Sequence, residues 1–176
     1  MTRFVGLIRG INVGGNRKLP MVTLREVVAA AGGSDVQTYI QSGNVVFAHD
    51  SVSDEALAVS IGQGILAAVG FEPRVMVRSA AQWAAAIAAN PYAVDDPTKV
   101  HVAFLDVAPD AERIDKFDRE RFAPEEFAVI GREMFLNLPT GMGVSKLAPA
   151  LSALKVDMTV RNWRTVLQLA DLVEPG

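Results

Sequence analysis

The sequence contains no cysteine and only two histidines, and both shortages exclude kinds of site. Without cysteine the chain has no disulfides, no thiolate metal ligands and no cysteine nucleophile. His49 stands near a loop and His101 lies within an apolar stretch, so we expect no histidine-rich metal site. No G-x-S-x-G motif marks a serine nucleophile. The sequence therefore predicts no metal site, does not indicate a cofactor and contains no recognisable nucleophile–base pair.

Long hydrophobic runs are also absent. No stretch approaches the roughly 20 apolar residues that cross a bilayer. The apolar run Phe4 to Ile8 is short and is followed by Arg9, which is not typical of a signal peptide. We therefore expect a cytoplasmic protein without a membrane segment.

The composition is that of a globular protein. The chain has 176 residues, of which 50% are hydrophobic and 21% charged, enough for one good core or for two small subdomains. The net charge of −3 argues against a general nucleic-acid coat but leaves room for a local basic site. Residues 1–50 hold five cations against three acids, whereas residues 95–126 hold five against ten. We interpret the acidic stretch as a solvated helix face with loops.

The first half predicts the order β-α-β-β-α-β, which is the split βαβ arrangement of ferredoxin-like domains. Turn chemistry and capping residues mark the boundaries. The expected elements are a strand at 4–8, a helix opened by Pro20, and a hairpin of "VQTYI" and "NVVFA" around "QSG". A helix at 53–69 and a strand "PRVMVRS" follow, and a helix begins at a Ser79–Gln82 capping box. We expect Trp83 to be a core anchor and the buried side of the 53–69 helix to consist of Leu57, Ile61, Ile65 and Leu66.

Much of this order returns after the turn-rich segment "NPYAVDDPT". "KVHVAFL" predicts a strand, residues 111–121 a helix, and "EFAVIG" with "REMFLNL" a hairpin turning at Gly131. A helical part follows at 144–154 and again at 163–172. We therefore predict an α+β protein of two ferredoxin-like (split βαβ) halves, the second followed by extra C-terminal helices. The halves are residues 1–90 and 99–176, joined by a linker at 91–98.

The segment "RGINVGGNRK", residues 9–18, joins the first strand to the first helix. Backbone N–H groups of a glycine-rich turn at a helix start suit an anion, and the nearby cations add charge. The segment has neither the Walker A pattern nor G-x-G-x-x-G. The alternative is a long turn whose glycines supply positive φ while the asparagines bond to backbone. The candidate ligand residues are Arg9, Asn12, Gly14, Gly15, Asn16 and Lys18.

A second polar loop, "QSGN" at residues 41–44, is expected beside the first one. In a split βαβ fold the first two strands are parallel and the third lies antiparallel between them. The loop after strand one and the hairpin after strand two therefore lie at one edge of the sheet, with Arg9 or Lys18 within reach of the Gln41 and Ser42 side chains. Gln41, Ser42 and Asn44 are the ligand candidates, unless "QSGN" only makes the tight hairpin.

Two C-terminal segments offer further candidates. "TGMGVSKL" places Ser145 and Lys146 in the first turn of a helix, and "TVRNWRT" places Arg161 and Trp163 beside Asn162, a predicted N-cap. The guanidinium of Arg161, the N-terminus of the helix and the ring of Trp163 could together bind an anion or a nucleotide. The alternative is a capped helix with a packed tryptophan. The adjacent acids Asp95–Asp96 and Glu125–Glu126 are interpreted as surface loops.

The motifs "GLIRGINVGGNRKLPM", "TYIQSGNVVF", "NPY", "KVHVAFL", "LNLPTGMGVSKL" and "TVRNWRTVLQLA" together resemble the bacterial proteins of domain-of-unknown-function family 1697. The resemblance spans nearly the whole chain in order, implies two ferredoxin-like halves and brings no activity. Met142 and Val144 depart from the aromatic and basic residues that the family often has there. Its characteristic positions correspond to Arg9, Gly10, Asn12, Gly14, Gly15, Lys18, Pro20, Gln41, Ser42, Gly43, Asn44, Ser145, Lys146, Arg161, Asn162 and Trp163.

Three functions follow as hypotheses. The first is a protein that binds a phosphate-bearing small molecule or nucleotide at the edge formed by Arg9 to Lys18 and Gln41 to Asn44. The second is weak, sequence-nonspecific nucleic-acid binding through the same basic edge. The third is an enzyme in which Lys18 or Lys146 supplies charge to a phosphate or carbonyl substrate. The sequence leaves the oligomeric state open.

Overall fold

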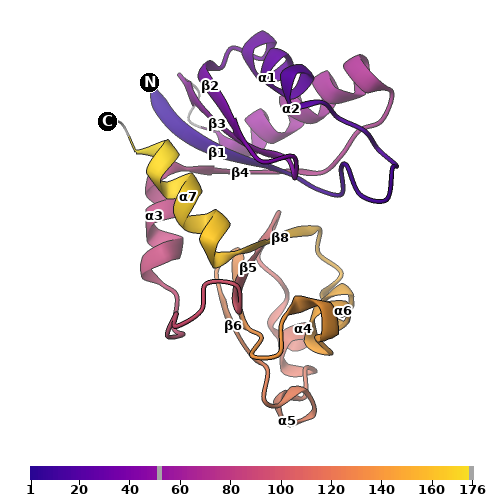
Figure 1. Ribbon diagram of the computed structural model, residues 1–176, viewed down its shortest axis with the longest axis vertical. Coiled ribbons are helices and arrows are strands. Elements are labelled where there is room, and N and C mark those ends of the chain that lie inside the picture. Colours follow the sequence, from indigo (N-terminus) through magenta and orange to yellow (C-terminus); the bar gives the residue numbers. More distant parts are fainter. Residues whose placement is uncertain (51–52, 175–176) are drawn as a thin grey trace. The chain divides into compact units, whose positions relative to one another are not determined.

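The computed structural model describes residues 1–50 and 53–174 (Figure 1). The chain divides into two compact units. The first unit comprises Met1–Ala85 and Gln168–Gly176, and the second comprises Ala86–Leu167. Among the described residues, none of the helices combines the length and the apolar character that crossing a membrane requires.

The first unit has the predicted split βαβ topology. Its sheet has the strand order β2-β3-β1-β4, and β1 is antiparallel to both β3 and β4. Because β2 is also antiparallel to β3, strands β1 and β2 run parallel, as expected. The elements are β1 (Thr2–Ile8), α1 (Met21–Ala30), β2 (Ser34–Tyr39), β3 (Asn44–His49), α2 (Asp54–Val69), β4 (Val75–Ser79) and α3 (Ala80–Ala88), which runs into the second unit.

Helices α1 and α2 lie together on one face of this sheet (Figure 1). They bury one apolar cluster with the sheet, in which the Phe4 and Phe47 rings stack at 5.8 Å between centroids. At Gly64 of α2 a Cβ would come within 2.6 Å of a Val27 methyl on α1, so glycine permits the helices to lie this close. Leu66 is exposed, contrary to expectation, because it lies about 100° around the helix from the buried Ile65.

The predicted ends of the helices are confirmed. The Ser53 hydroxyl accepts a hydrogen bond from the Ala56 N–H at 3.1 Å, and Gly70 ends α2 with a φ of 83°. The capping box before α3 is complete. The Ser79 N–H donates to the Gln82 side chain at 2.7 Å, and the Gln82 N–H donates to the Ser79 hydroxyl at 3.2 Å. Local side-chain chemistry therefore sets where these helices begin.

The second unit repeats the topology, with the strand order β6-β7-β5-β8. The predicted helix at 111–121 is two short helices, because the Asp118 carboxylate caps a new one by accepting from the N–H groups of Glu120 and Arg121. The elements are β5 (Val100–Leu105), α4 (Ala111–Asp115), α5 (Arg119–Phe122), β6 (Glu126–Ile130), β7 (Glu133–Asn137), η1 (Met142–Val144), α6 (Leu147–Ala150), η2 (Leu151–Leu154), β8 (Met158–Asn162) and α7 (Trp163–Val173), whose end belongs to the first unit.

Strand β8 is absent from the sequence-based prediction, which assigned only helices after residue 144. It pairs with β5 and completes the sheet as β4 does in the first unit. Its five residues alternate between half-buried and buried positions. The cap signal at Asn162 pointed to the following helix and hid the short strand before it.

The two units also share residues at matching positions. Arg78 on β4 lies opposite Val5, and Arg161 on β8 lies opposite Val102. Both arginines are buried, and each donates to the carbonyl of the valine before it, at 3.0 and 2.9 Å. A helix-capping residue follows each of them. The repeat of element order is thus accompanied by a residue-level repeat that the sequence alone did not disclose.

We predict that Gly43→Ala destabilises the protein by about 2–4 kcal/mol, because positive φ and a steric clash both oppose the new methyl. Gly43 has a φ of 80°, and a Cβ there would lie 2.8 Å from the Ile8 Cβ. The matched control is Gly70→Ala, where φ is 83° but no atom lies within 4 Å. Urea denaturation of both variants measures the difference, and equal losses would contradict the close contact.

Candidate functional site

The glycine-rich loop forms a small hairpin, Asn12 to Arg17, which we call the finger. The Asn12 N–H donates to the Arg17 carbonyl at 3.2 Å, and the Asn16 N–H donates to the Val13 carbonyl at 3.1 Å. Gly14 and Gly15, at its tip, have φ values of 60° and 78°, the positive pair that a type I′ turn requires. The finger therefore has a defined shape, and Figure 1 shows the loop extending beyond the sheet.

The side chain of Asn12 joins the finger to the "QSGN" hairpin. Its Nδ2 donates to the Leu19 carbonyl at 3.0 Å and to the Gln41 carbonyl at 2.9 Å, and its Oδ1 accepts from the Leu19 N–H at 2.9 Å. The Ile8 N–H donates to the Gly43 carbonyl at 2.8 Å. The prediction that the two loops meet at one edge is confirmed. We call residues 9–19 and 40–44 the joined edge.

The residues of the "QSGN" hairpin have different roles. Asn44 is fully buried, and its Nδ2 donates to the Tyr39 carbonyl at 3.1 Å and to the Ser42 hydroxyl at 2.9 Å. Asn44 and Ser42 therefore hold the turn together. Gln41 keeps an exposed side chain while its carbonyl receives Asn12. Of the three candidates, Gln41 is the one that the turn leaves exposed to a ligand.

Cations gather at the joined edge. The Arg17 guanidinium lies 5.5 Å from the centre of the Phe71 ring, and the Arg9 N–H donates to the Arg74 carbonyl at 2.9 Å. Arg9, Arg17 and Lys18 all belong to the same loop, and all three side chains are exposed. Within the described part of the chain, neither Arg17 nor Lys18 forms an ion pair. The reach of Arg9 or Lys18 to the Gln41 and Ser42 side chains stays a prediction.

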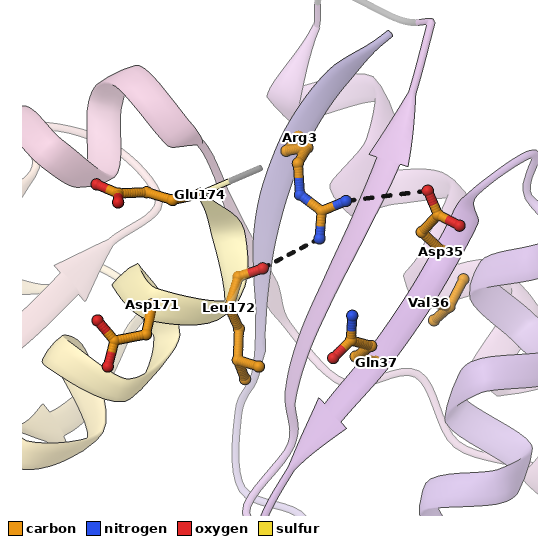
Figure 2. Close-up of a pocket in the computed structure, with 7 residues that line it drawn as sticks. All are labelled: Arg3, Asp35, Val36, Gln37, Asp171, Leu172 and Glu174. Atoms are coloured by element: carbon orange, nitrogen blue, oxygen red, sulfur yellow. Dashed lines mark hydrogen bonds and ion pairs between the residues drawn. The ribbon is translucent and has the colours of Figure 1, made fainter. Parts of the chain in front are cut away.

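The pocket drawn in Figure 2 lies away from the joined edge and offers less to an anion. It is lined by Arg3, Asp35, Val36, Gln37, Asp171, Leu172 and Glu174. The Arg3 guanidinium donates to the Leu172 carbonyl at 3.0 Å and lies 4.0 Å from the Asp35 carboxylate. Three acids against one engaged cation make this pocket unsuited to a phosphate. None of the residues that line this pocket was among the ligand candidates predicted from the sequence.

The expected anion site at Ser145 and Lys146 receives a carboxylate of the chain itself. Glu125, interpreted from the sequence as a surface residue, is only 6% exposed. It accepts from the Ser145 hydroxyl at 2.9 Å and from the N–H groups of Lys146 and Leu147 at 3.1 and 2.8 Å. These donors are therefore engaged internally. Glu125 and Ser145 are twenty positions apart, so no local pattern in the sequence points to this contact.

At the start of α7 the structure agrees with a capped helix and a packed tryptophan. The Asn162 side chain accepts from the Thr165 N–H at 2.9 Å, which confirms the N-cap, and Trp163 is buried. The Arg161 guanidinium donates to the Thr159 hydroxyl at 2.6 Å, and its burial lowers the arginine pKa to about 10. The Asn162 side chain is therefore occupied in capping α7, and the Trp163 ring is buried.

His101 is a buried histidine on β5. It is 6% exposed, and its Nδ1 has no hydrogen-bond partner among the described residues. Burial lowers the pKa of His101, and a hydrogen bond to the Lys99 backbone opposes this shift in part.

A metal site would need a group of at least three His, Asp or Glu side chains. Over residues 1–50 and 53–174 the structure contains no such group.

Comparisons with known proteins bear on the fold. The family model described as "Protein of unknown function (DUF1697)" matches residues 1–135, which confirms the resemblance. The structure of conserved bacterial protein SP0830 from Streptococcus pneumoniae is similar at 24% identity and a TM-score of 0.74, covering 98% of this chain and 99% of that one. No curated protein matches the sequence. The structural likeness shows a shared fold and no activity.

We predict that Asn12→Ala lowers the free energy of unfolding by about 1–3 kcal/mol, because it leaves the Leu19 N–H and carbonyl without their side-chain partner. The matched control is Asn16→Ala on the same finger, where the exposed side chain makes no hydrogen bond to any residue that the structure describes, and the loss is within about 0.5 kcal/mol. Denaturation curves give both values. Equal losses would show that Asn12 does not join the loops.

A second prediction concerns pH. Because the folded pKa of His101 lies below its unfolded value near 6.5, the unfolded chain binds the proton first. The stability that neutral His101 provides is therefore complete above about pH 6.5 and is lost as the pH falls below it. His101→Leu flattens the stability profile between about pH 7 and 5. An unchanged slope in His101→Leu would contradict this account.

Proposed function

The chain belongs to the DUF1697 family of proteins of unknown function, and we propose that its first unit binds a phosphate-bearing small molecule or nucleotide at the joined edge. The observation that carries the proposal is the Asn12 side chain, which fixes the finger against the "QSGN" hairpin while Arg17 and Lys18 stay exposed beside it. A cytoplasmic location suits such a ligand.

Preorganisation supports this proposal. The finger has its own hairpin bonds, and Asn12 ties it to two other segments. A ligand that meets such a loop need not order it, so less of the interaction energy is lost on binding. The exposed guanidinium of Arg17 and ammonium of Lys18 donate hydrogen bonds to phosphate oxygens.

The tip of the finger supports the same proposal. At Gly14 and Gly15 no described residue other than the chain neighbours has an atom within 4 Å of the position that a Cβ would take, so the backbone there is open to approach. Backbone N–H groups in such turns donate to anions. The polar side chain of Gln41, on the other loop, adds a neutral hydrogen-bonding group. Together these groups suit a phosphate and the polar atoms next to it.

A nucleic acid is the second candidate. The specific observation in its favour is that residues 13–18 form an unbroken exposed run that includes both cations. Small-molecule sites are usually concave, whereas a projecting basic loop can follow a phosphate backbone. Binding of this kind reads no sequence and falls steeply as salt is raised, because each phosphate contact releases counterions.

The test is the double variant Arg17→Ala/Lys18→Ala, titrated with pyrophosphate, ATP and a single-stranded oligonucleotide. We expect binding to weaken for every ligand that the wild-type protein binds. The control is Arg113→Ala/Lys116→Ala, which removes two exposed cations of the second unit and leaves binding unchanged. For the single-stranded oligonucleotide, the double variant also makes the slope of log K against log salt shallower by about 1.4, because each lost phosphate contact removes about 0.7. Lack of phosphate binding by the folded wild-type protein would refute the proposal.

A further inference from the structure

Ile40, at the start of the "QSGN" hairpin, has an unusual backbone. Its φ is 48°, in the left-handed region that glycine and asparagine adopt easily and β-branched residues avoid. Among the non-glycine residues of positive φ that the structure describes, Ile40 is the one with a β-branched side chain. The others are Asn12, Arg17, Asp35 and Lys155.

The surroundings of Ile40 impose this conformation from both sides. The carbonyl of Tyr39 accepts from the buried Asn44, and the carbonyl of Gln41 accepts from Asn12. A residue held in a strained conformation persists only where its surroundings over-determine it, and such residues cluster at ligand sites. The side chain of Ile40 is 52% exposed and lies outside the apolar core cluster of this unit. Core packing therefore does not account for an isoleucine at this position.

The finger carries a second exposed apolar side chain, Val13. Val13 follows Asn12 on the finger, while Ile40 precedes the Gln41 that Asn12 contacts, so the two flank the same hydrogen bond. Val13 is 70% exposed. The cations Arg17 and Lys18 stand on the same loop. The two loops of the joined edge therefore carry both exposed aliphatic side chains and cations.

We propose that Ile40 and Val13 contact the base of a nucleotide whose phosphate lies against Arg17 and Lys18; this rests on the proposed function. An inorganic phosphate presents charge but no apolar face, whereas a nucleotide presents both and matches both features of the edge. The phosphate complements the cations, and the flat base covers the two exposed aliphatic side chains. A free nucleotide and one unit of a single strand share this chemistry.

The test is Ile40→Asn, because asparagine tolerates the left-handed conformation and removes the apolar contact. We expect the thermal midpoint to stay the same or rise. We expect the affinity for AMP or for a single-stranded homopolymer to fall at least about fivefold, while the affinity for pyrophosphate is unchanged. The control is Val107→Asn in the second unit, 56% exposed in a loop, which changes none of these affinities.

The outcomes separate this inference from the proposed function. If the wild-type protein binds pyrophosphate but Ile40→Asn leaves nucleotide affinity unchanged, the base contact is wrong and the phosphate site stands. If Ile40→Asn lowers the thermal midpoint, Ile40 is a packing residue and the inference fails. If the wild-type protein binds no phosphate at all, both proposals fail. Stronger binding of AMP than of the homopolymer, at equal nucleotide concentration, identifies a free nucleotide as the source.

Discussion

The side-chain amide of Asn12 is the interaction on which the shape of the joined edge depends. One side chain donates to two carbonyls and accepts from one N–H, and so connects the finger, the segment entering α1 and the hairpin between β2 and β3. Leu19, whose backbone it holds, is buried in the core beneath. The side chain of Asn12 thereby ties the exposed finger to the segments beside it. A loop that is anchored and exposed at once is what recognition of a small charged group requires.

The two units share a fold and place their polar residues differently. In the first unit the loops at the joined edge present Arg17, Lys18 and Gln41 to solvent. In the second unit, the buried carboxylate of Glu125 accepts from the Ser145 hydroxyl and from the Leu147 N–H. Polar groups paired in this way stabilise a fold because each buried donor has its partner. The same split βαβ topology thus supports an exposed polar edge in one unit and, in the other, a loop whose donors bond to a buried carboxylate.

Local patterns predicted much of this from the sequence. The capping residues Ser53, Ser79 and Asn162 carry their signal in the adjacent residues, and the meeting of the two loops follows from strand order alone. Strand β8 was missed because the polar residues Thr159 and Arg161 occupy its buried positions and a stronger helix signal adjoins it. The burial of Glu125 was missed because its partners lie twenty residues further along the chain, where no local pattern can point. The strained φ of Ile40 has no sequence signature, since its cause is a pair of contacts made by Asn12 and Asn44.

The central claim is that the joined edge is a preformed site for phosphate. The most direct measurement is a titration of isotope-labelled protein with a nucleotide, followed by backbone amide chemical shifts. The account predicts saturable shifts at Gly14, Gly15, Arg17, Lys18 and Gln41, with the finger already ordered before ligand is added. Shifts confined to the second unit, or none at any accessible concentration, would contradict it.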